Sequence, residues 1–317
     1  MVRILFRLFG FYLLFSASAF AASMDQPKIL IVPKGMSLTF WQVVESGVKK
    51  ASNELNQPVI WRGPYNDNDL NSQIAIIRNY LNSNVEVLAV AAIDAHLITP
   101  FIMQYQRRGK RVLVFDSQAI GANPMGFIAS NNYQAGKRLV ESIATQFRGD
   151  VHALIVQNDA GHASTEERLV GFQDQLKHYG ITSLTLIEAG STKGSALHAT
   201  YAALVADPRI NMVLAVNEAT TEGAALAIKK LKRGNTLLAG FDINDGIYRL
   251  LHDDVITQLV VQDPYAMGYQ VMQQANMLLK GEQIAPTTEV PIRLIDKASL
   301  ADPETNAFIR HFLKVPK

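Results

Sequence analysis

Cysteine is absent from the 317-residue sequence. A lipid anchor on an N-terminal cysteine is therefore excluded, and so is any disulfide bond. Stability must come from the burial of apolar side chains alone. The length is enough to supply such a core and suggests two domains of typical size.

Motifs typical of several enzyme classes are also missing. The sequence contains no Gly-x-Ser-x-Gly, no His-Glu-x-x-His and no Gly-x-x-x-x-Gly-Lys. Ser46 and Lys49 match a Ser-x-x-Lys pattern, but they lie inside an amphipathic helical pattern and no Lys-Thr-Gly follows. Residues 67–69 match the first positions of a calcium-binding loop, but Ser72 and Arg78 occupy the sixth and twelfth positions, where such a loop needs Gly and Glu. The seven histidines lack the i, i+4 spacing of a helical metal site. We therefore expect no catalytic residue, no metal and no cofactor.

Excess positive charge is confined to the first residues of the chain. Arg3 and Arg7 precede an apolar run over residues 8–15, and Ala19-Phe20-Ala21 has the small-x-small pattern of a cleavage site. This is typical of a secretory signal peptide, predicted over residues 1–21. The alternative is a membrane anchor, but small and polar residues occupy the second half of the run. We expect a periplasmic protein that is not embedded in the membrane after cleavage.

The mature chain has no charge excess. Lys and Arg total 30 and Asp and Glu total 28, so the loss of Arg3 and Arg7 leaves a formally neutral protein. Neutrality argues against nucleic acid and against an anionic membrane surface as partners.

Strand and helix signals alternate along the whole chain, in two sets that divide near residues 128–130. Apolar runs of strand length occupy residues 28–32, 59–61, 85–90, 112–115, 153–156, 185–187, 212–216, 237–241 and 256–261. Patterns with three- and four-residue apolar spacing predict helices over 39–55, 70–81, 97–107, 133–147, 165–178, 194–205, 220–231 and 265–279. This order predicts an α/β fold of two similar lobes with parallel sheets.

Polar and aromatic residues gather where the predicted strands end. In open α/β sheets, ligands bind beyond the carboxyl ends of the strands. Carboxylate, amide and guanidinium groups can hold vicinal hydroxyls in pairs, and aromatic rings can cover the apolar face of a sugar. The candidate ligand-binding residues are Lys34, Phe40, Trp41, Asp116, Arg168, Asn217, Asp242 and Gln262.

Each candidate also has a structural interpretation. Asn217, like Asp94 and Asn158, could cap a helix. Phe40 and Trp41 could belong to the core, Arg168 could pair with Glu167 or Glu141 on the surface, and Lys34 could be solvated. The combination of several such junctions favours a binding site.

The chain resembles the type I periplasmic sugar-binding proteins, the ribose-binding group of ABC importers. The resemblance rests on PKGMSLTFWQVVESGVKKA, VEVLAVAAIDAHLI, RVLVFDSQ, GFIASNNYQAGKRLVE, GHASTEERLVGF, LAVNEATTEGAALAI, LLAGFDIND, VVQDPYAMGY and LLKGEQI. It implies two Rossmann-like lobes, residues 27–130 with 263–291 and residues 131–262 with 292–317. It also implies three hinge crossings, near residues 129–132, 262–263 and 290–293, with the ligand between the lobes.

Carried over by position, the resemblance makes Phe40 and Trp41 the aromatic pair. It makes Asp116, Arg168, Asn217, Asp242 and Gln262 the polar residues that contact the ligand. Some positions depart from the ribose-type pattern: residues 34–39 replace an Asn-rich loop and add a cation, Ala91 replaces an Asn, and Ser117 replaces an Arg. These departures point away from ribose and leave another pentose or hexose, a polyol or a sugar acid open.

Three functions are compatible with the sequence. The first is a solute-binding protein that closes on a monosaccharide or polyol and delivers it to an ABC transporter permease. The second uses the same module as a sensor that presents its ligand to a chemoreceptor or a histidine kinase. The third is a secreted hydrolase with Asp116 and Asp242 as paired carboxylates.

Overall fold

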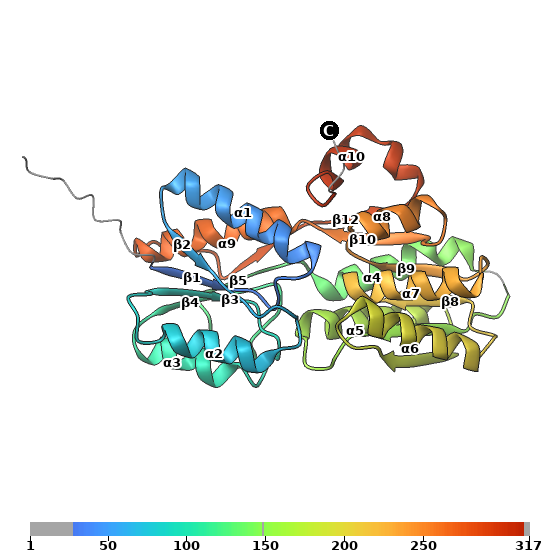
Figure 1. The fold of residues 1–317 in the computed structure, drawn as a ribbon, viewed down its shortest axis with the longest axis horizontal. Coiled ribbons are helices and arrows are strands. Elements are labelled where there is room, and N and C mark those ends of the chain that lie inside the picture. Colours follow the sequence, from blue (N-terminus) through green and yellow to red (C-terminus); the bar gives the residue numbers. More distant parts are fainter. Residues whose placement is uncertain (1–27, 148, 314–317) are drawn as a thin grey trace, which may run out of the picture.

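The computed structural model describes residues 28–147 and 149–313, and in this part of the chain the strands form two six-stranded sheets. The predicted signal peptide, residues 1–21, lies outside the described residues. The sheets belong to two α/β lobes that lie side by side (Figure 1). None of the helices in these residues combines the length and the apolar character needed to span a bilayer.

The first lobe is built on a sheet with the strand order β11-β5-β4-β3-β1-β2. All of its neighbouring strands run parallel. Its strands are β1 (Ile29–Val32), β2 (Val59–Trp61), β3 (Val87–Val90), β4 (Arg111–Phe115), β5 (Gly126–Ala129) and β11 (Thr287–Glu289). Its helices are α1 (Thr39–Leu55), α2 (Leu70–Tyr80), α3 (Thr99–Arg107) and α9 (Pro264–Leu279).

The second lobe has the strand order β12-β10-β9-β8-β6-β7, and only the β10–β12 pair of the described strands is antiparallel. Its strands are β6 (Ala153–Gln157), β7 (Leu184–Glu188), β8 (Met212–Ala215), β9 (Leu237–Phe241), β10 (Gln258–Gln262) and β12 (Ile292–Ile295). Its helices are α4 (Asn132–Ile143), α5 (Ala163–His178), α6 (Lys193–Ala206), α7 (Glu218–Leu231), α8 (Asp245–His252) and α10 (Pro303–Ile309), with 3₁₀ turns at Ala144–Gln146 and Ala298–Ala301.

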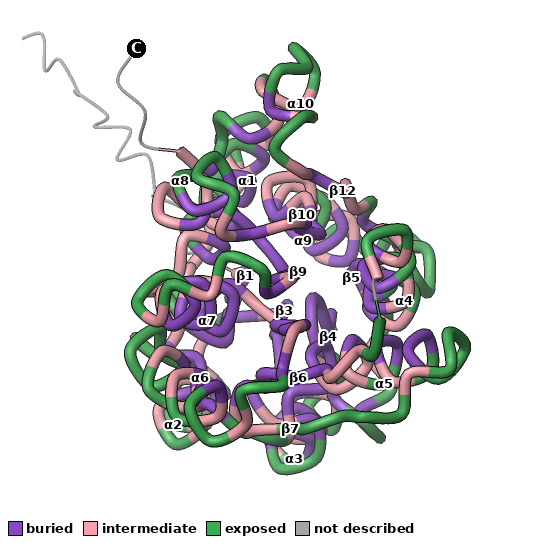
Figure 2. The backbone as a smooth tube through the Cα atoms, turned by 90° about the vertical axis from the view of Figure 1, so that its right-hand side faces the viewer, coloured by how far each residue is buried: buried purple, intermediate pink, exposed green. Residues whose placement is uncertain are grey.

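The strands read as apolar runs because both faces of each sheet are covered by helices. In β1, Ile29 and Ile31 belong to the apolar cluster under α1 and α9, whereas Leu30 and Val32 belong to the cluster under α2 and α3. Successive side chains of a strand point to opposite faces, so one run fills two core layers. Figure 2 shows the result, with buried strands inside and exposed backbone along the outer helices.

Glycine sets how closely the two helices on one face approach. A Cβ on Gly47 of α1 would lie 2.1 Å from the carbonyl oxygen of Tyr265, and a Cβ on Gly268 of α9 would lie 2.0 Å from that of Val44. Both distances are far below van der Waals contact, so only glycine permits this crossing. The crossing fixes the position of α1, whose first turn borders the site described below.

The described chain passes between the sheets three times: from β5 to α4, from β10 to α9 and from β11 to β12. The prediction of two α/β lobes joined by three crossings is confirmed. Most predicted elements agree with the structure within a few residues. The prediction of one helix over 133–147 was wrong at its end, because the α-helix stops at Ile143 and a 3₁₀ turn follows. Strands β5, β11 and β12 and helices α8 and α10 are not among the predicted ranges.

Candidate functional site

The two lobes present equivalent aspartates at the ends of equivalent strands. Asp116 directly follows β4 and Asp242 directly follows β9. Both adopt a left-handed backbone conformation, with φ of 57° and 65°. The backbone N–H of each donates to the neighbouring strand, to the carbonyl of Ile128 at 2.9 Å and of Val260 at 2.8 Å. A left-handed conformation is unfavourable for a residue with a Cβ, and Asp is among the few types that tolerate it. This turn directs both carboxylates into the space between the lobes.

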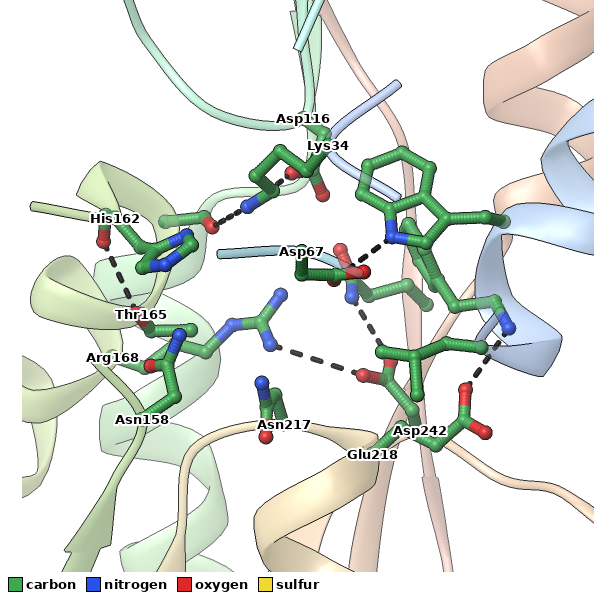
Figure 3. A pocket seen from close by; sticks show the side chains of 15 residues that line it. Lys34, Asp67, Asp116, Asn158, His162, Thr165, Arg168, Asn217, Glu218 and Asp242 are labelled. Atoms are coloured by element: carbon green, nitrogen blue, oxygen red, sulfur yellow. Dashed lines mark hydrogen bonds and ion pairs between the residues drawn. The ribbon is translucent and has the colours of Figure 1, made fainter. Parts of the chain in front are cut away.

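All eight candidate residues lie around one pocket, at the facing carboxyl ends of the two sheets (Figure 3). The structure thus brings together the whole set expected from the sequence. The described residues that complete the lining are Leu38, Asp67, Asn158, His162, Ser164, Thr165 and Glu218.

Lys34 is buried in an ion pair and is not solvated. Its Nζ lies 2.8 Å from Asp116 Oδ2 and donates to Ser164 Oγ of the second lobe at 3.0 Å. Only 6% of Lys34 is exposed. The interpretation of Lys34 as a surface cation was therefore wrong, and its charge is already balanced by a carboxylate.

Arg168 is likewise held inside the pocket wall. Its Nε donates to Asn132 Oδ1 at 2.9 Å, one terminal nitrogen donates to the carbonyl of Val216 at 2.8 Å, and the same nitrogen lies 4.0 Å from Asp242 Oδ2. The guanidinium lies 4.1 Å from the centre of the Phe241 ring. With 2% of its surface exposed, Arg168 does not form the surface pair with Glu167 or Glu141 that was the alternative.

Gln262 and Asp242 form a fixed pair, because Gln262 Nε2 donates to Asp242 Oδ1 at 3.0 Å. Asn217 lines the pocket and also caps α7, since its Oδ1 accepts from the backbone N–H of Thr220 at 3.0 Å. The capping interpretation of Asn217 is confirmed, and its ligand-binding role stays a prediction. Asn158 does not cap a helix, and its buried Oδ1 has no hydrogen-bond partner.

Phe40 and Trp41 are core residues that also border the pocket, and their role in ligand binding stays a prediction. Both are buried in the apolar cluster under α1 and both line the pocket. Their rings meet edge to face at 4.9 Å between centroids. Trp41 Nε1 donates to Asp67 Oδ2 at 2.9 Å. The core therefore holds the aromatic pair rigidly at the edge of the pocket.

Two carboxyl groups at the site escaped the sequence analysis. Burial raises the pKa of Asp67 to about 6, against the opposing hydrogen bond from Trp41. Burial also raises the pKa of Glu218 to about 7, against the hydrogen bonds it accepts. Glu218 directly follows Asn217 at one of the recognised strand–helix junctions, and Asp67 lies in the loop after β2. Because both residues follow strands, their positions could have identified them as residues of the pocket.

Apart from Leu38, which directly precedes α1, the other unexpected lining residues come from the loop after β6 and the start of α5. Burial lowers the pKa of His162 to about 3, so its imidazole is neutral at physiological pH. Ser164 accepts from Lys34 and, through its backbone N–H, donates to Ser117 Oγ at 3.3 Å. In the described residues, no group of three or more His, Asp or Glu side chains is arranged to hold a metal ion.

Direct bonds join the two lobes around the pocket. Besides the contacts of Ser164, the backbone N–H of Ala95 donates to the carbonyl of Gly161 at 3.0 Å. The lobes are therefore in contact, and the structure is a closed conformation. The pocket offers many acceptor oxygens, and the cations that line it are both engaged by carboxylates.

Comparison with known proteins gives consistent results. The family model described as periplasmic binding protein domain matches residues 29–283. The ribose import binding protein of Escherichia coli is 22% identical over 282 residues, which are 89% of this chain and 95% of that protein.

Two solved structures are also similar. The periplasmic component of an ABC-type sugar transport system from Hahella chejuensis is 32% identical, with a TM-score of 0.82, over 85% of this chain and all of that one. A carbohydrate transporter solute-binding protein from Agrobacterium radiobacter, in complex with D-arabinose, is 27% identical, with a TM-score of 0.84, over 90% of this chain and all of that one.

Proposed function

Because the chain belongs to the periplasmic binding protein domain family, we propose that it captures a monosaccharide or a related polyol between its lobes and delivers it to an ABC importer. The names of two similar proteins support this ligand class: one is a ribose import binding protein, and the other is a solute-binding protein in complex with D-arabinose. The observation that carries the proposal is the convergence of acceptor-rich side chains from both lobes on one pocket beside a buried aromatic pair.

We propose Lys34, Phe40, Trp41, Asp116, Arg168, Asn217, Asp242 and Gln262 as the ligand-binding residues. The rings would cover one apolar face of the sugar, and the carboxylates and amides would accept its hydroxyl protons. A missing or inverted hydroxyl would leave a buried polar group unpaired, which is how the pocket would separate epimers.

The engagement of both cations favours a neutral ligand over a sugar acid. Lys34 is paired with Asp116, and Arg168 is bonded to Asn132 and Val216 and lies 4.0 Å from Asp242. A ligand carboxylate would have to displace these partners and would meet the buried carboxyls of Asp67 and Glu218. Wherever these carboxyls are ionised, they would repel a ligand carboxylate, because like charges repel strongly in a buried site.

We propose lobe boundaries at residues 27–130 with 263–291 and 131–262 with 292–317, which agree with the sheet membership of the strands. Ligand would favour the closed state because only that state offers contacts from both lobes. We also propose a signal peptide over residues 1–21 and a periplasmic location. The relatives are named as binding proteins, and we expect binding without turnover.

A thermal-shift screen of the mature chain, begun at Ala22, tests the proposal. A ligand present at 100 times its dissociation constant stabilises the fold by about 2.7 kcal/mol. We expect one pentose, hexose or polyol to raise the melting temperature, while the matching sugar acid does not. The shift should be lost in Asp242→Asn and Arg168→Met and kept in the control Arg209→Met, whose side chain is exposed. No shift with any sugar or polyol would refute the proposal.

A further inference from the structure

Helix α1 begins without a capping side chain of its own lobe. The residue before it is Leu38, which cannot accept a hydrogen bond through its side chain. The first backbone N–H groups of a helix have no acceptor within the helix. In this structure the N–H groups of Thr39 and Phe40 donate to Glu218, at 3.2 Å to Oε1 and 3.0 Å to Oε2.

Glu218 belongs to the other lobe, where it is the first residue of α7. Its position there is fixed, because Asn244 Nδ2 donates to its Oε1 at 2.9 Å. The carboxyl faces the pocket and the start of α1 (Figure 3), and 4% of the residue is exposed. The two bonds to α1 can exist only while the lobes are in contact.

We propose that Glu218 is a cap for α1 that is supplied across the cleft, so that closure of the lobes completes the first turn of the helix that carries Phe40 and Trp41. Glu218 is a positioning residue: it acts on the ligand through the aromatic pair. When the lobes separate, water replaces the carboxyl at Thr39 and Phe40. When they close, the carboxyl accepts both donors at once and the start of α1 becomes fixed against the pocket.

The energetics follow from the capping geometry. Loss of a helix cap costs about 1 kcal/mol, which corresponds to a roughly fivefold change in an equilibrium constant. Without Glu218, closure would bury the N–H of Phe40, which lies in a buried residue, with no acceptor from the protein. The penalty falls on the closed state alone, because in the open state both N–H groups face water. The inference rests on the proposed function only in linking closure to ligand capture.

Hydrogen exchange at two amides tests the proposal without any ligand. Because the chain has no cysteine, Ser117→Cys with Ser164→Cys introduces a single pair, at residues already in contact across the cleft. The oxidised protein is locked closed and the reduced protein is free to open. We expect the amides of Thr39 and Phe40 to exchange about fivefold more slowly in the oxidised form, the factor that corresponds to a helix cap. Equal exchange in both forms would overturn the proposal.

Variants of two glutamates on α7 separate the cap from general stability. Glu218→Ala should abolish the protection of the two amides and leave the later turns of α1 protected. Glu222→Ala is the matched control, because Glu222 also accepts from Asn244 and its other described hydrogen bond comes from Lys193 and not from α1. Should Glu218→Ala fail to fold, Glu218→Gln keeps one acceptor oxygen instead of two and should abolish the protection of one of the two amides. Retained protection in the Glu218 variants would refute the cap.

Ligand affinity gives an independent measurement on the protein without cysteines. With the sugar identified by the screen, Glu218→Ala should bind about fivefold more weakly and Glu222→Ala should bind as the parent does. Unchanged affinity in Glu218→Ala would refute the positioning role. If no sugar binds, the proposed function fails while the exchange experiment still decides whether the cap exists.

Discussion

Replacement of Arg168 by Met should destabilise the ligand-free protein by an amount that depends on pH. Met keeps an unbranched apolar chain against the Phe241 ring but removes the charge that lies 4.0 Å from Asp242. At this separation, opposite charges attract by about 4 kcal/mol at an effective dielectric constant of 20. The carbonyl of Val216 and the Oδ1 of Asn132 also lose a donor each.

Protonation of Asp242 limits the loss of folding stability in Arg168→Met. Burial already raises the pKa of Asp242, and Arg168 is the main group that opposes this rise. Without Arg168 the pKa rises further, so the carboxyl takes up a proton when the pH is low enough. Where it is protonated, the penalty shrinks by about 1.4 kcal/mol for each unit that the pH falls. We therefore expect a loss of about 4 kcal/mol at pH 8 and a markedly smaller loss at pH 5.

Urea denaturation at the two pH values measures these losses, with Arg168→Met combined with Asp242→Asn as the decisive variant. The double variant has no buried charge at this position and should recover most of the stability at pH 8. The exposed control Arg209→Met should cost less than about 0.5 kcal/mol. A loss in Arg168→Met that is the same at both pH values, or a double variant as unstable as the sum of its parts, would refute the reasoning.

Three further predictions concern the walls of the pocket and the helices behind it. Burial raises the pKa of Glu218 to about 7 in the folded state, so this carboxyl stabilises the fold only while it is protonated. Glu218→Gln should therefore be less stable than the parent below about pH 4.5, and should gain on the parent by up to about 3 kcal/mol as the pH rises through about 7. Melting curves of both proteins across this pH range test the prediction. Gly47→Ala should cost at least about 1–3 kcal/mol in urea denaturation, because its Cβ would meet the carbonyl of Tyr265 at 2.1 Å. Trp41→Phe removes the hydrogen bond to Asp67 and should cost about 1–3 kcal/mol near pH 8 and less near pH 5, where protonation relieves the buried carboxyl.

Most of the fold was predictable because the central strands of both sheets are buried on both faces and helices such as α1 carry one apolar stripe. The bounds of α1, β2 and β9 agree with the apolar pattern at both ends. The C-terminal strands β11 and β12 gave no such signal. Their residues are mostly partly or fully exposed at sheet edges, so polar side chains interrupt the pattern. The antiparallel direction of β12 depends on the crossing between the lobes, which no local pattern encodes.

The residues around the pocket were predictable where a polar side chain directly follows a strand, as for Asp116 and Asp242. The partners of these side chains were not. The bond from Lys34 to Ser164 and the bonds from α1 to Glu218 join segments more than 100 residues apart and cross between the lobes. Such contacts depend on how the closed lobes meet, and a single sequence carries no periodic signal for that.

The three crossings also determine when the first lobe can be completed during translation. Strand β5 pairs with β11, and α9 supplies Met267, Val271 and Met272 to the core under β1 and α1. The first lobe is thus complete only when residue 289 has been translated, although its first five strands end at residue 129. At about 5–20 residues per second, that interval lasts roughly ten to thirty seconds. For most of it the helix that covers this apolar face of the first lobe has not yet been completed.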